Sequence, residues 1–385
     1  MPLLTAARVA DIRPFYVMEI LARARDLEAQ GRSIIHMEIG EPDFVTPQPI
    51  IDAGKRALDR GYTHYTPAVG LTALREAVAD FYDRHYGVRP SPKRIFITPG
   101  ASGALLLAMA LLVNPRSRVL TTDPGYPCNR HLIRLMEGEA VNIPVTAETN
   151  FQLTPAMIKE HWSPTTAAVL MASPANPTGA VCNRESLADI TACTQRLGGV
   201  LVVDEIYHGL TYSNSAPSVL NVTDGAFVIN SFSKYFGMTG WRLGWMVVPE
   251  DYQADVDKLA QNIFLAAPTI AQHAALAAYT AETSAILEQR RIEFMRRRDF
   301  LLPALRDLGF HIPATPQGAF YLYAGCDRFS DDSQTFAADI LEHTGVAITP
   351  GLDFGTHKAR RHVRFAYTTS IENLEAGVER LRKYL

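Results

Sequence analysis

The chain has 385 residues, of which 47% are hydrophobic and 20% charged, and its formal net charge at pH 7 is -3. This composition is ordinary for a globular protein with a large core, and the small negative charge gives no electrostatic case for binding nucleic acid or membranes. No apolar run reaches the roughly 18 residues of a membrane span, and the first residues lack the basic start and long apolar stretch of a signal peptide. We therefore expect a cytoplasmic protein.

The cysteines and histidines give no sign of a metal site. The four cysteines are far apart in the sequence and match no metal-ligand spacing, and the eleven histidines form no spaced pairs. Reduced thiols in a cytoplasmic enzyme explain this pattern best. We predict that the protein binds no metal.

The first part of the chain is predicted to hold a helix over residues 16–30 and a short strand over residues 34–39, which ends at Gly40. A tyrosine-containing stretch, residues 62–71, leads into an amphipathic helix. The apolar face of that helix is formed by Leu71, Leu74, Val78 and Phe81.

From residue 94 onward, short apolar strands alternate with amphipathic helices, which predicts a mainly parallel sheet covered on both faces. Ligands of such sheets bind beyond the carboxyl ends of the strands, where the polar residues discussed below lie. The predicted strands are 95–98, 119–122, 140–143, 168–171, 200–204, 227–230 and 244–248, and the helices include 102–112, 153–160 and 184–197.

A long helical region over residues 268–305 leads to a second, smaller unit. Its predicted elements are strands at 318–322, 346–349 and 362–367, a helix at 333–343 and a C-terminal helix. We interpret residues 45–285 as one large domain. Residues 1–44 and 286–385 are interpreted as a small domain built from both termini.

The most distinctive block for chemistry is residues 231–245, where Lys234 is surrounded by aromatic and hydroxyl side chains. Loss of hydration lowers a lysine pKa toward the free amine, and a free amine can form a Schiff base with an aldehyde. Eight residues later, Arg242 offers a planar guanidinium suited to a phosphate. The block therefore predicts a reactive lysine beside an anion site.

Residues 98–105 predict a strand end, a glycine turn and a helix start. Unpaired N–H groups make a helix N-terminus an anion site, here through Ala101 and Ser102, although Ser102 would also serve as an ordinary N-cap. Given Lys234 and Arg242, we interpret this turn as a second side of a phosphate site and Ser231 as its third contributor.

Two charged side chains are predicted inside apolar strands. Asp204 ends the strand over residues 200–204 and needs a partner, because an unpaired buried charge is expensive. Its neighbour Glu205 is interpreted as solvated or as the start of a helix, and His208 as structural. Arg364 lies within an apolar strand of the small unit, where it needs either an internal salt bridge or a bound anion.

These residues, together with the string Asn-Pro-Thr-Gly at 176–179, resemble the motifs of the class I/II aminotransferases of the aspartate aminotransferase family. That family has fold type I and uses pyridoxal phosphate (PLP). The motifs run in the family's order from Gly40 to Arg364, nearly the whole chain. The resemblance implies an α/β fold, in which a large domain with a mainly parallel seven-stranded sheet covered by helices is joined by a smaller α+β domain.

The resemblance also implies a role for each residue around the cofactor ring. Lys234 binds PLP covalently and moves the α proton of the substrate. Asp204 pairs with the pyridine nitrogen, and Tyr126 stacks on the ring. Asn176 and Tyr207 hydrogen-bond its phenolic oxygen.

The phosphate and the substrate are assigned in the same way. The resemblance implies that Ala101, Ser102, Ser231 and Arg242 bind the phosphate, helped in a homodimer by Tyr65 of the partner subunit. The substrate is bound by Gly40, Asn176 and Arg364, and Arg364 grips its α-carboxylate.

The predicted reaction is transfer of the amino group of an amino acid to a 2-oxo acid in a ping-pong cycle between PLP and pyridoxamine phosphate. The aromatic residues Phe15, Tyr16, Tyr126 and Tyr321 favour a neutral aliphatic or aromatic donor, with 2-oxoglutarate or pyruvate as acceptor. Consistently, Ser102 and Gly103 stand where one branch with dicarboxylic substrates carries a lysine.

Other functions are compatible with parts of the pattern. A β-eliminating carbon–sulfur lyase shares nearly every motif and stays an alternative. A non-catalytic regulator with an aminotransferase-like module would carry an added DNA-binding domain and a basic surface, whereas here the pattern starts almost at Met1 and the net charge is negative. A nicotinamide-dependent dehydrogenase would need a Gly-x-Gly-x-x-Gly string, which the sequence lacks.

Overall fold

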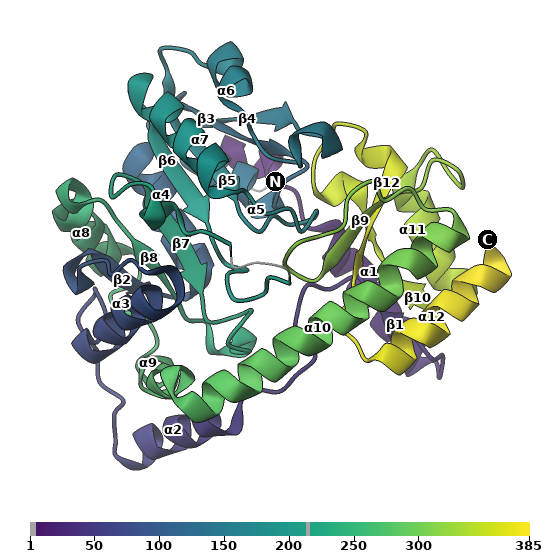
Figure 1. Ribbon diagram of the computed structural model, residues 1–385, viewed down its shortest axis with the longest axis horizontal. Coiled ribbons are helices and arrows are strands. Elements are labelled where there is room, and N and C mark those ends of the chain that lie inside the picture. Colours follow the sequence, from purple (N-terminus) through teal and green to yellow (C-terminus); the bar gives the residue numbers. More distant parts are fainter. Residues whose placement is uncertain (1–4, 213–215) are drawn as a thin grey trace.

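The computed structural model describes residues 5–212 and 216–385, and these form two packed units (Figure 1). The larger unit is built on a seven-stranded sheet with the order β2-β8-β7-β6-β5-β3-β4. All neighbouring strands are parallel except β8, which is antiparallel to both β2 and β7. The prediction of a mainly parallel sheet is therefore confirmed. The strands are β2 Ile95–Thr98, β3 Arg118–Asp123, β4 Glu139–Pro144, β5 Thr166–Ala172, β6 Val200–Asp204, β7 Phe227–Ser231 and β8 Gly244–Val247.

The central strands are apolar throughout because both faces of the sheet are covered. Along β5, Val169 and Met171 pack into one core while Ala168 and Leu170 pack into the other. Helices α4 and α8 contribute to the second core, and α3, α6, α7 and α9 to the first. The helices of this unit are α2 Gln48–Asp59, α3 Thr72–Tyr86, α4 Gly100–Leu112, α5 Pro127–Leu135, α6 Pro155–His161, α7 Arg184–Arg196, α8 Gln253–Ile263 and α9 Thr269–Ala275.

The smaller unit joins residues from both ends of the chain. Strand β1 (Ile35–His36) pairs in parallel with β10 (Val346–Ala347). A second, antiparallel sheet has the order β11-β12-β9. Its strands are β9 Tyr321–Gly325, β11 Thr349–Pro350 and β12 His362–Ala366, and the helices of the unit are α1 Tyr16–Ala29, α11 Ser333–Thr344 and α12 Ile371–Tyr384.

One long helix, α10 (Ala281–Leu308), connects the two units. Figure 1 shows it running from α2 and α9 under the large sheet to α12 beside the small one. The domain limits at residues 44 and 285 stay a prediction, and the second limit falls inside α10. The predicted helical region over residues 268–305 is interrupted before α10, because Thr280 ends one segment and its side chain accepts from the N–H of Thr283 at 3.3 Å.

Three predicted strands of the small unit differ from the structure. The strand at 34–39 is reduced to β1, and the strand at 346–349 is divided between two sheets as β10 and β11. The strand at 318–322 begins three residues later, as β9, because the N–H groups of Gly318 and Ala319 donate to Gly179 and Leu210 in the large unit. Tertiary contacts therefore set these boundaries.

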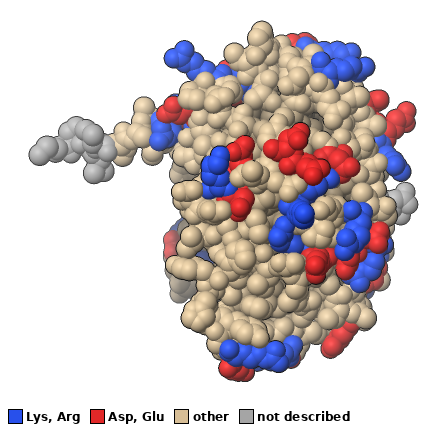
Figure 2. All heavy atoms as spheres, turned by 90° about the vertical axis from the view of Figure 1, so that its left-hand side faces the viewer, with Lys and Arg blue, Asp and Glu red and all other residues tan. Residues whose placement is uncertain are grey.

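No helix in the described part of the chain is long and apolar enough to span a bilayer. On the face shown in Figure 2, basic and acidic side chains are interspersed, and neither sign dominates a continuous area. This mixed surface agrees with the small net charge of the chain.

Candidate active site

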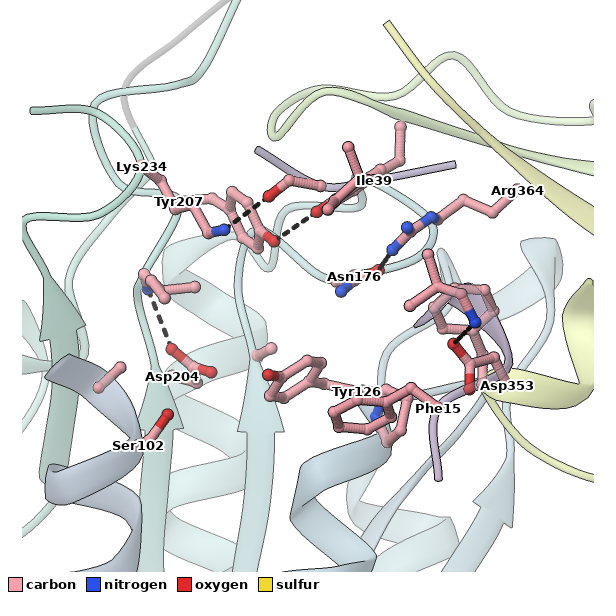
Figure 3. A pocket seen from close by; sticks show the side chains of 18 of the residues that line it. Phe15, Ile39, Ser102, Tyr126, Asn176, Asp204, Tyr207, Lys234, Asp353 and Arg364 are labelled. Carbon is pink, nitrogen blue, oxygen red and sulfur yellow. Dashed lines mark hydrogen bonds between the residues drawn. The ribbon is translucent and has the colours of Figure 1, made fainter. Parts of the chain in front are cut away.

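A cavity of about 190 Å³ lies between the two units, at the carboxyl ends of β5 and β6 (Figure 3). The large unit contributes Asp204 and Lys234 to its wall, and the small unit contributes Tyr321 and Arg364. A second hollow of about 350 Å³ adjoins it, because Lys234 lines both. The site is therefore where a parallel sheet is expected to bind its ligand.

Lys234 follows the end of β7, and its amine points into the site (Figure 3). Its Nζ donates to the main-chain oxygen of Gly40 at 2.6 Å. Burial lowers the pKa of Lys234 to about 8, and the nearby charges of Arg364 and Arg242 act in the same direction, against Glu41 and Asp204. Near neutral pH, a larger fraction of this amine is therefore uncharged and nucleophilic than for an ordinary lysine.

Asp204 is the last residue of β6, is buried, and lies on the same side of the cavity as Lys234 (Figure 3). One carboxylate oxygen accepts from the N–H of Ile206 at 3.1 Å. Burial raises the pKa of Asp204 to about 7, although this hydrogen bond and the charge of Lys234 favour the ionised form. A cation placed against the carboxylate would stabilise its charge.

The interpretation of Glu205 as solvated or helix-starting is wrong. Its side chain is fully buried, and its carboxylate accepts from the Ser218 hydroxyl at 3.0 Å and from the N–H of Val219 at 2.8 Å. No helix begins at this position. Burial raises the pKa of Glu205 to about 8. The carboxylate binds the start of a 3-10 turn instead, a partner too distant in sequence to be recognised locally.

The second hollow is lined by Ala101, Ser102, Ser231 and Arg242. Helix α4 begins at Gly100, so Ala101 and Ser102 lie in its first turn, and the alternative of Ser102 as an N-cap is wrong. Gly100 has a φ of +70°, and a Cβ there would lie 2.6 Å from Nη2 of Arg242. Glycine thus lets the guanidinium of Arg242 approach the N-terminus of α4. The positive guanidinium and the free N–H groups of the helix both favour a bound anion.

Arg364 lies in β12, and its guanidinium is buried among polar acceptors and aromatic rings. Nη1 donates to Oδ1 of Asn176 at 3.0 Å, and Nη2 donates to the main-chain oxygen of Glu38 at 2.5 Å. Its Cζ lies 4.2 Å from the ring centre of Tyr321 and 4.7 Å from that of Phe354. No acidic side chain of residues 5–212 or 216–385 forms an ion pair with it, so the alternative of an internal salt bridge is not supported.

Aromatic residues shape the rest of the cavity. The hydroxyls of Tyr207 and Tyr321 are hydrogen-bonded at 2.8 Å, and Tyr126 stacks on Phe15 with ring centres 6.5 Å apart. Gly40 must be glycine for this arrangement, because a Cβ would lie 1.9 Å from the hydroxyl oxygen of Tyr321.

The structure brings nearly all the predicted site residues together. The joined hollows are lined by Gly40, Ala101, Ser102, Tyr126, Asn176, Asp204, Tyr207, Ser231, Lys234, Arg242 and Arg364. Tyr65 lies apart from them and is 83% exposed in this single chain. Tyr16 lines an adjacent hollow, whereas Phe15, Tyr126 and Tyr321 line the cavity itself.

The residues of the site that sequence reasoning missed include Glu38, Ile39, Asp353 and Phe354. Asp353 is the last residue of the 3-10 turn Gly351–Asp353 after β11, and the main-chain oxygen of Glu38 accepts from Arg364. Neither position carries a local sequence signal. Only the paired termini place them at the cavity.

Comparison with known proteins agrees with this fold and site. Residues 32–381 match the family model "Aminotransferase class I and II". The chain is 36% identical to the (5-formylfuran-3-yl)methyl phosphate transaminase of Methanocaldococcus jannaschii, with 98% of both chains covered. It is also 36% identical to the valine–pyruvate aminotransferase of Mycobacterium tuberculosis, covering 98% of this chain and 97% of that one. The aspartate aminotransferase of Thermus thermophilus with maleate superposes with a TM-score of 0.94 at 33% identity, with both chains fully covered.

The chain therefore belongs to the class I and II aminotransferase family and has its fold, which confirms the resemblance seen in the sequence. It is a PLP-dependent aminotransferase. The residues present fit this cofactor. The cradle between Gly100 and Arg242 is open only because position 100 lacks a Cβ, and it lies beside a lysine of lowered pKa and a buried carboxylate, Asp204.

Proposed function

We propose that this enzyme transfers the α-amino group of a neutral aliphatic or aromatic amino acid to a 2-oxo acid, in two half-reactions of a ping-pong cycle. One observation carries the proposal: Lys234 and Arg364 face the same cavity, one as an amine of lowered pKa and the other as a buried cation with no acidic partner in the described chain. A base and a carboxylate-binding cation are what removal of an α proton from an amino acid requires.

The α-carboxylate of the substrate is bound by Arg364, supported by Asn176. Arg364 is held in place by the oxygens of Asn176 and Glu38, and its Nε is buried without a partner. A carboxylate satisfies this remaining donor and offsets the buried charge. Gly40, which lines the cavity, lets the Tyr321 hydroxyl approach the main chain, because a Cβ there would lie 1.9 Å from it, and we assign Gly40 to the substrate site.

Bound PLP supplies an electron sink for the negative charge that develops at the α-carbon. Lys234 Nζ removes and returns the α proton as a general base. Asp204 keeps a proton on the pyridine nitrogen, and Tyr126 offers an aromatic face to the ring. Asn176 and Tyr207 hydrogen-bond the phenolic oxygen.

The phosphate group is assigned to Ala101, Ser102, Ser231 and Arg242. We assign Tyr65 of the partner subunit to the same group, in a homodimer, because the exposed tyrosine has no role within its own subunit's cavity. A cytoplasmic location and a division into a large domain (45–285) and a small one (1–44 and 286–385) complete the proposal.

The substrate class is supported by the wall of the cavity. Phe15, Val17, Ile39 and Phe354 give it an apolar lining, which favours an apolar side chain. A relative named for valine and pyruvate agrees with this preference.

A single-turnover experiment tests the proposal. The PLP-loaded enzyme is mixed with one amino acid at a time, without any 2-oxo acid, and its absorption spectrum is followed. We expect leucine, valine and phenylalanine to convert the cofactor to its pyridoxamine form, with one 2-oxo acid released per site. Persistence of the PLP band while pyruvate and ammonia accumulate from a cysteine-type substrate would instead support the carbon–sulfur lyase.

A further inference from the structure

Two tyrosine hydroxyls meet across the boundary between the two units. Tyr207 follows β6 in the large unit, whereas Tyr321 begins β9 in the small unit. Their hydroxyl oxygens lie 2.8 Å apart, and both side chains are buried in the wall of the cavity. The rings meet edge to face, with their centres 5.7 Å apart. The proposed function uses Tyr207 but gives no chemical role to Tyr321.

The hydrogen bond between these two hydroxyls has a preferred direction. Tyr207 is assigned to donate its proton to the phenolic oxygen of the cofactor, which leaves its own oxygen free to accept a hydrogen bond. The hydroxyl of Tyr321 has no other hydrogen-bond partner within residues 5–212 and 216–385, so its proton is available for Tyr207. Tyr321 is therefore the donor and Tyr207 the acceptor when the cofactor is bound.

The guanidinium of Arg364 makes Tyr321 a stronger donor. Strands β9 and β12 are neighbours in the small sheet, and Cζ of Arg364 lies 4.2 Å from the ring centre of Tyr321. Burial raises the pKa of the Tyr321 hydroxyl, and the positive charge of Arg364 acts in the opposite direction. A cation over the ring draws electron density away from the hydroxyl, which strengthens the hydrogen bond that the hydroxyl donates.

We propose that Tyr321 is a positioning residue that acts on the cofactor through Tyr207. The inference rests on the proposed function, in which Tyr207 donates to the phenolic oxygen of PLP. Tyr321 holds the Tyr207 hydroxyl in place and polarises it, because hydrogen bonds in a chain strengthen one another. A stronger bond from Tyr207 weakens the hold of the phenolic oxygen on the proton that it shares with the nitrogen of Lys234. Tyr321 thus sets how tightly the cofactor holds this proton, and not how tightly PLP is bound.

A pH titration of the absorption spectrum of the PLP-loaded enzyme tests this proposal without any substrate. The midpoint of the titration measures how tightly lysine-bound PLP holds its proton. Tyr207→Phe should raise the midpoint by about 1 pH unit, because the direct hydrogen bond is lost. Tyr321→Phe should raise it by about 0.3–0.5 unit, because only the polarisation of Tyr207 is lost. Each phenylalanine keeps the buried ring and removes one hydroxyl, so the fold should be retained.

A double variant separates action through Tyr207 from a general structural effect of position 321. If Tyr321 acts only through Tyr207, Tyr321→Phe should shift the midpoint by less than about 0.1 unit in an enzyme that already carries Tyr207→Phe. An equal shift with and without the Tyr207 hydroxyl would overturn the proposal. The charged groups that act on Lys234 also influence the midpoint, and they are unchanged in every variant. These groups are Glu41, Asp204, Arg242 and Arg364.

Tyr323→Phe is the matched control. Tyr323 lies two residues further along β9 and is also buried, but it does not line the cavity, and its hydroxyl has no hydrogen-bond partner in the described part of the chain. Its loss should leave the midpoint unchanged. A rise like that of Tyr321→Phe would show that any change in β9 alters the cofactor, and it would overturn the proposal.

Failure of this proposal and failure of the proposed function give different results. An unchanged midpoint in Tyr321→Phe, together with a raised midpoint in Tyr207→Phe, overturns the proposal alone. An unchanged midpoint in Tyr207→Phe overturns the assignment of Tyr207 to the phenolic oxygen, and the proposal with it. Transamination itself fails separately, in the single-turnover experiment above. In that case the spectral titration still decides the role of Tyr321, because it needs no turnover.

Discussion

The two sides of the active site are built in different ways. The large-unit side takes Ser231, Lys234 and Arg242 from one short segment and Asp204 from the neighbouring strand. The small-unit side depends on residues more than 300 positions apart, since Arg364 donates to the oxygen of Glu38 and Asp353 accepts from Tyr16. Much of the proposed cofactor site thus comes from short stretches of the large unit, whereas the proposed substrate site needs both ends of the chain to meet. Changes on the two sides should therefore have separable effects.

The largest effect is expected for Lys234→Ala, which removes the base and the covalent attachment together. Turnover should fall by roughly a thousandfold or more, and the absorption band of lysine-bound PLP should disappear. The melting temperature should change little. Lys258→Ala, at an exposed lysine paired with Asp255, is the matched control. Retained turnover in Lys234→Ala would refute the assignment.

Asp204→Asn should separate activity from stability on the large-unit side. Turnover should fall by about a hundredfold or more, since a preorganised charge is lost. The pKa of Asp204 is raised to about 7, so the folded protein without PLP binds the proton more tightly than the unfolded chain. Its free energy of unfolding therefore falls as pH rises from about 4 to about 7, because the buried carboxyl must ionise. Above about pH 7 the whole of this loss of stability is present.

The asparagine variant has no carboxyl to ionise at this position, so its free energy of unfolding does not fall with pH for this reason. It should be more stable than the original protein by a few kcal/mol at pH 8 when both lack PLP, with little difference at pH 4. Denaturant unfolding at the two pH values measures this. Equal stability at pH 8 would mean that the buried carboxylate is already compensated within the chain.

A pair of arginine-to-lysine changes sharpens the comparison further. Arg364→Lys should raise KM for amino acids about 10- to 100-fold and leave the affinity for PLP unchanged, because lysine cannot grip a carboxylate bidentately. Arg242→Lys should do the reverse and weaken PLP retention. Kinetic constants and cofactor titration for both variants supply the measurement. If each variant loses both its affinity for amino acids and its affinity for PLP, the large-unit and small-unit sides of the site do not act separately.

The smallest effect is expected at His36, a partly exposed residue of β1 in the small unit. Its Nδ1 lies 2.7 Å from the buried carboxylate of Glu38. This contact raises the pKa of His36 to about 9. The stabilisation is fully present below about pH 6.5 and is lost as pH rises through about 9.

The unfolding free energy of His36→Asn should therefore be lower by about 1 kcal/mol at pH 6, a value reduced by solvent screening of a partly exposed histidine. The difference should shrink above pH 9. His64→Asn, at an exposed histidine, provides the control. A loss that is independent of pH would show that shape, and not the ion pair, accounts for the effect.

The difference between the large-unit side and the small-unit side also explains which parts of the fold and site the sequence could predict. The strands of the large sheet were recognisable because buried parallel strands are continuously apolar, and the residues at their ends follow directly from their position. The small unit was harder, since β1, β10 and β11 have only two residues each and are set by pairing between the termini. Glu205 was misjudged for the same reason, because Ser218 and Val219 reach it through the fold. Asp353 and Glu38 had no local signal at all.

The most direct test of the whole account follows the nitrogen atom. The PLP-loaded enzyme is given leucine labelled with ¹⁵N and unlabelled pyruvate, and the products are examined by mass spectrometry. If the two sides meet as described, the label appears in alanine, together with an equal amount of the 2-oxo acid of leucine. Label released as ammonium, or retained entirely in leucine, would contradict the account.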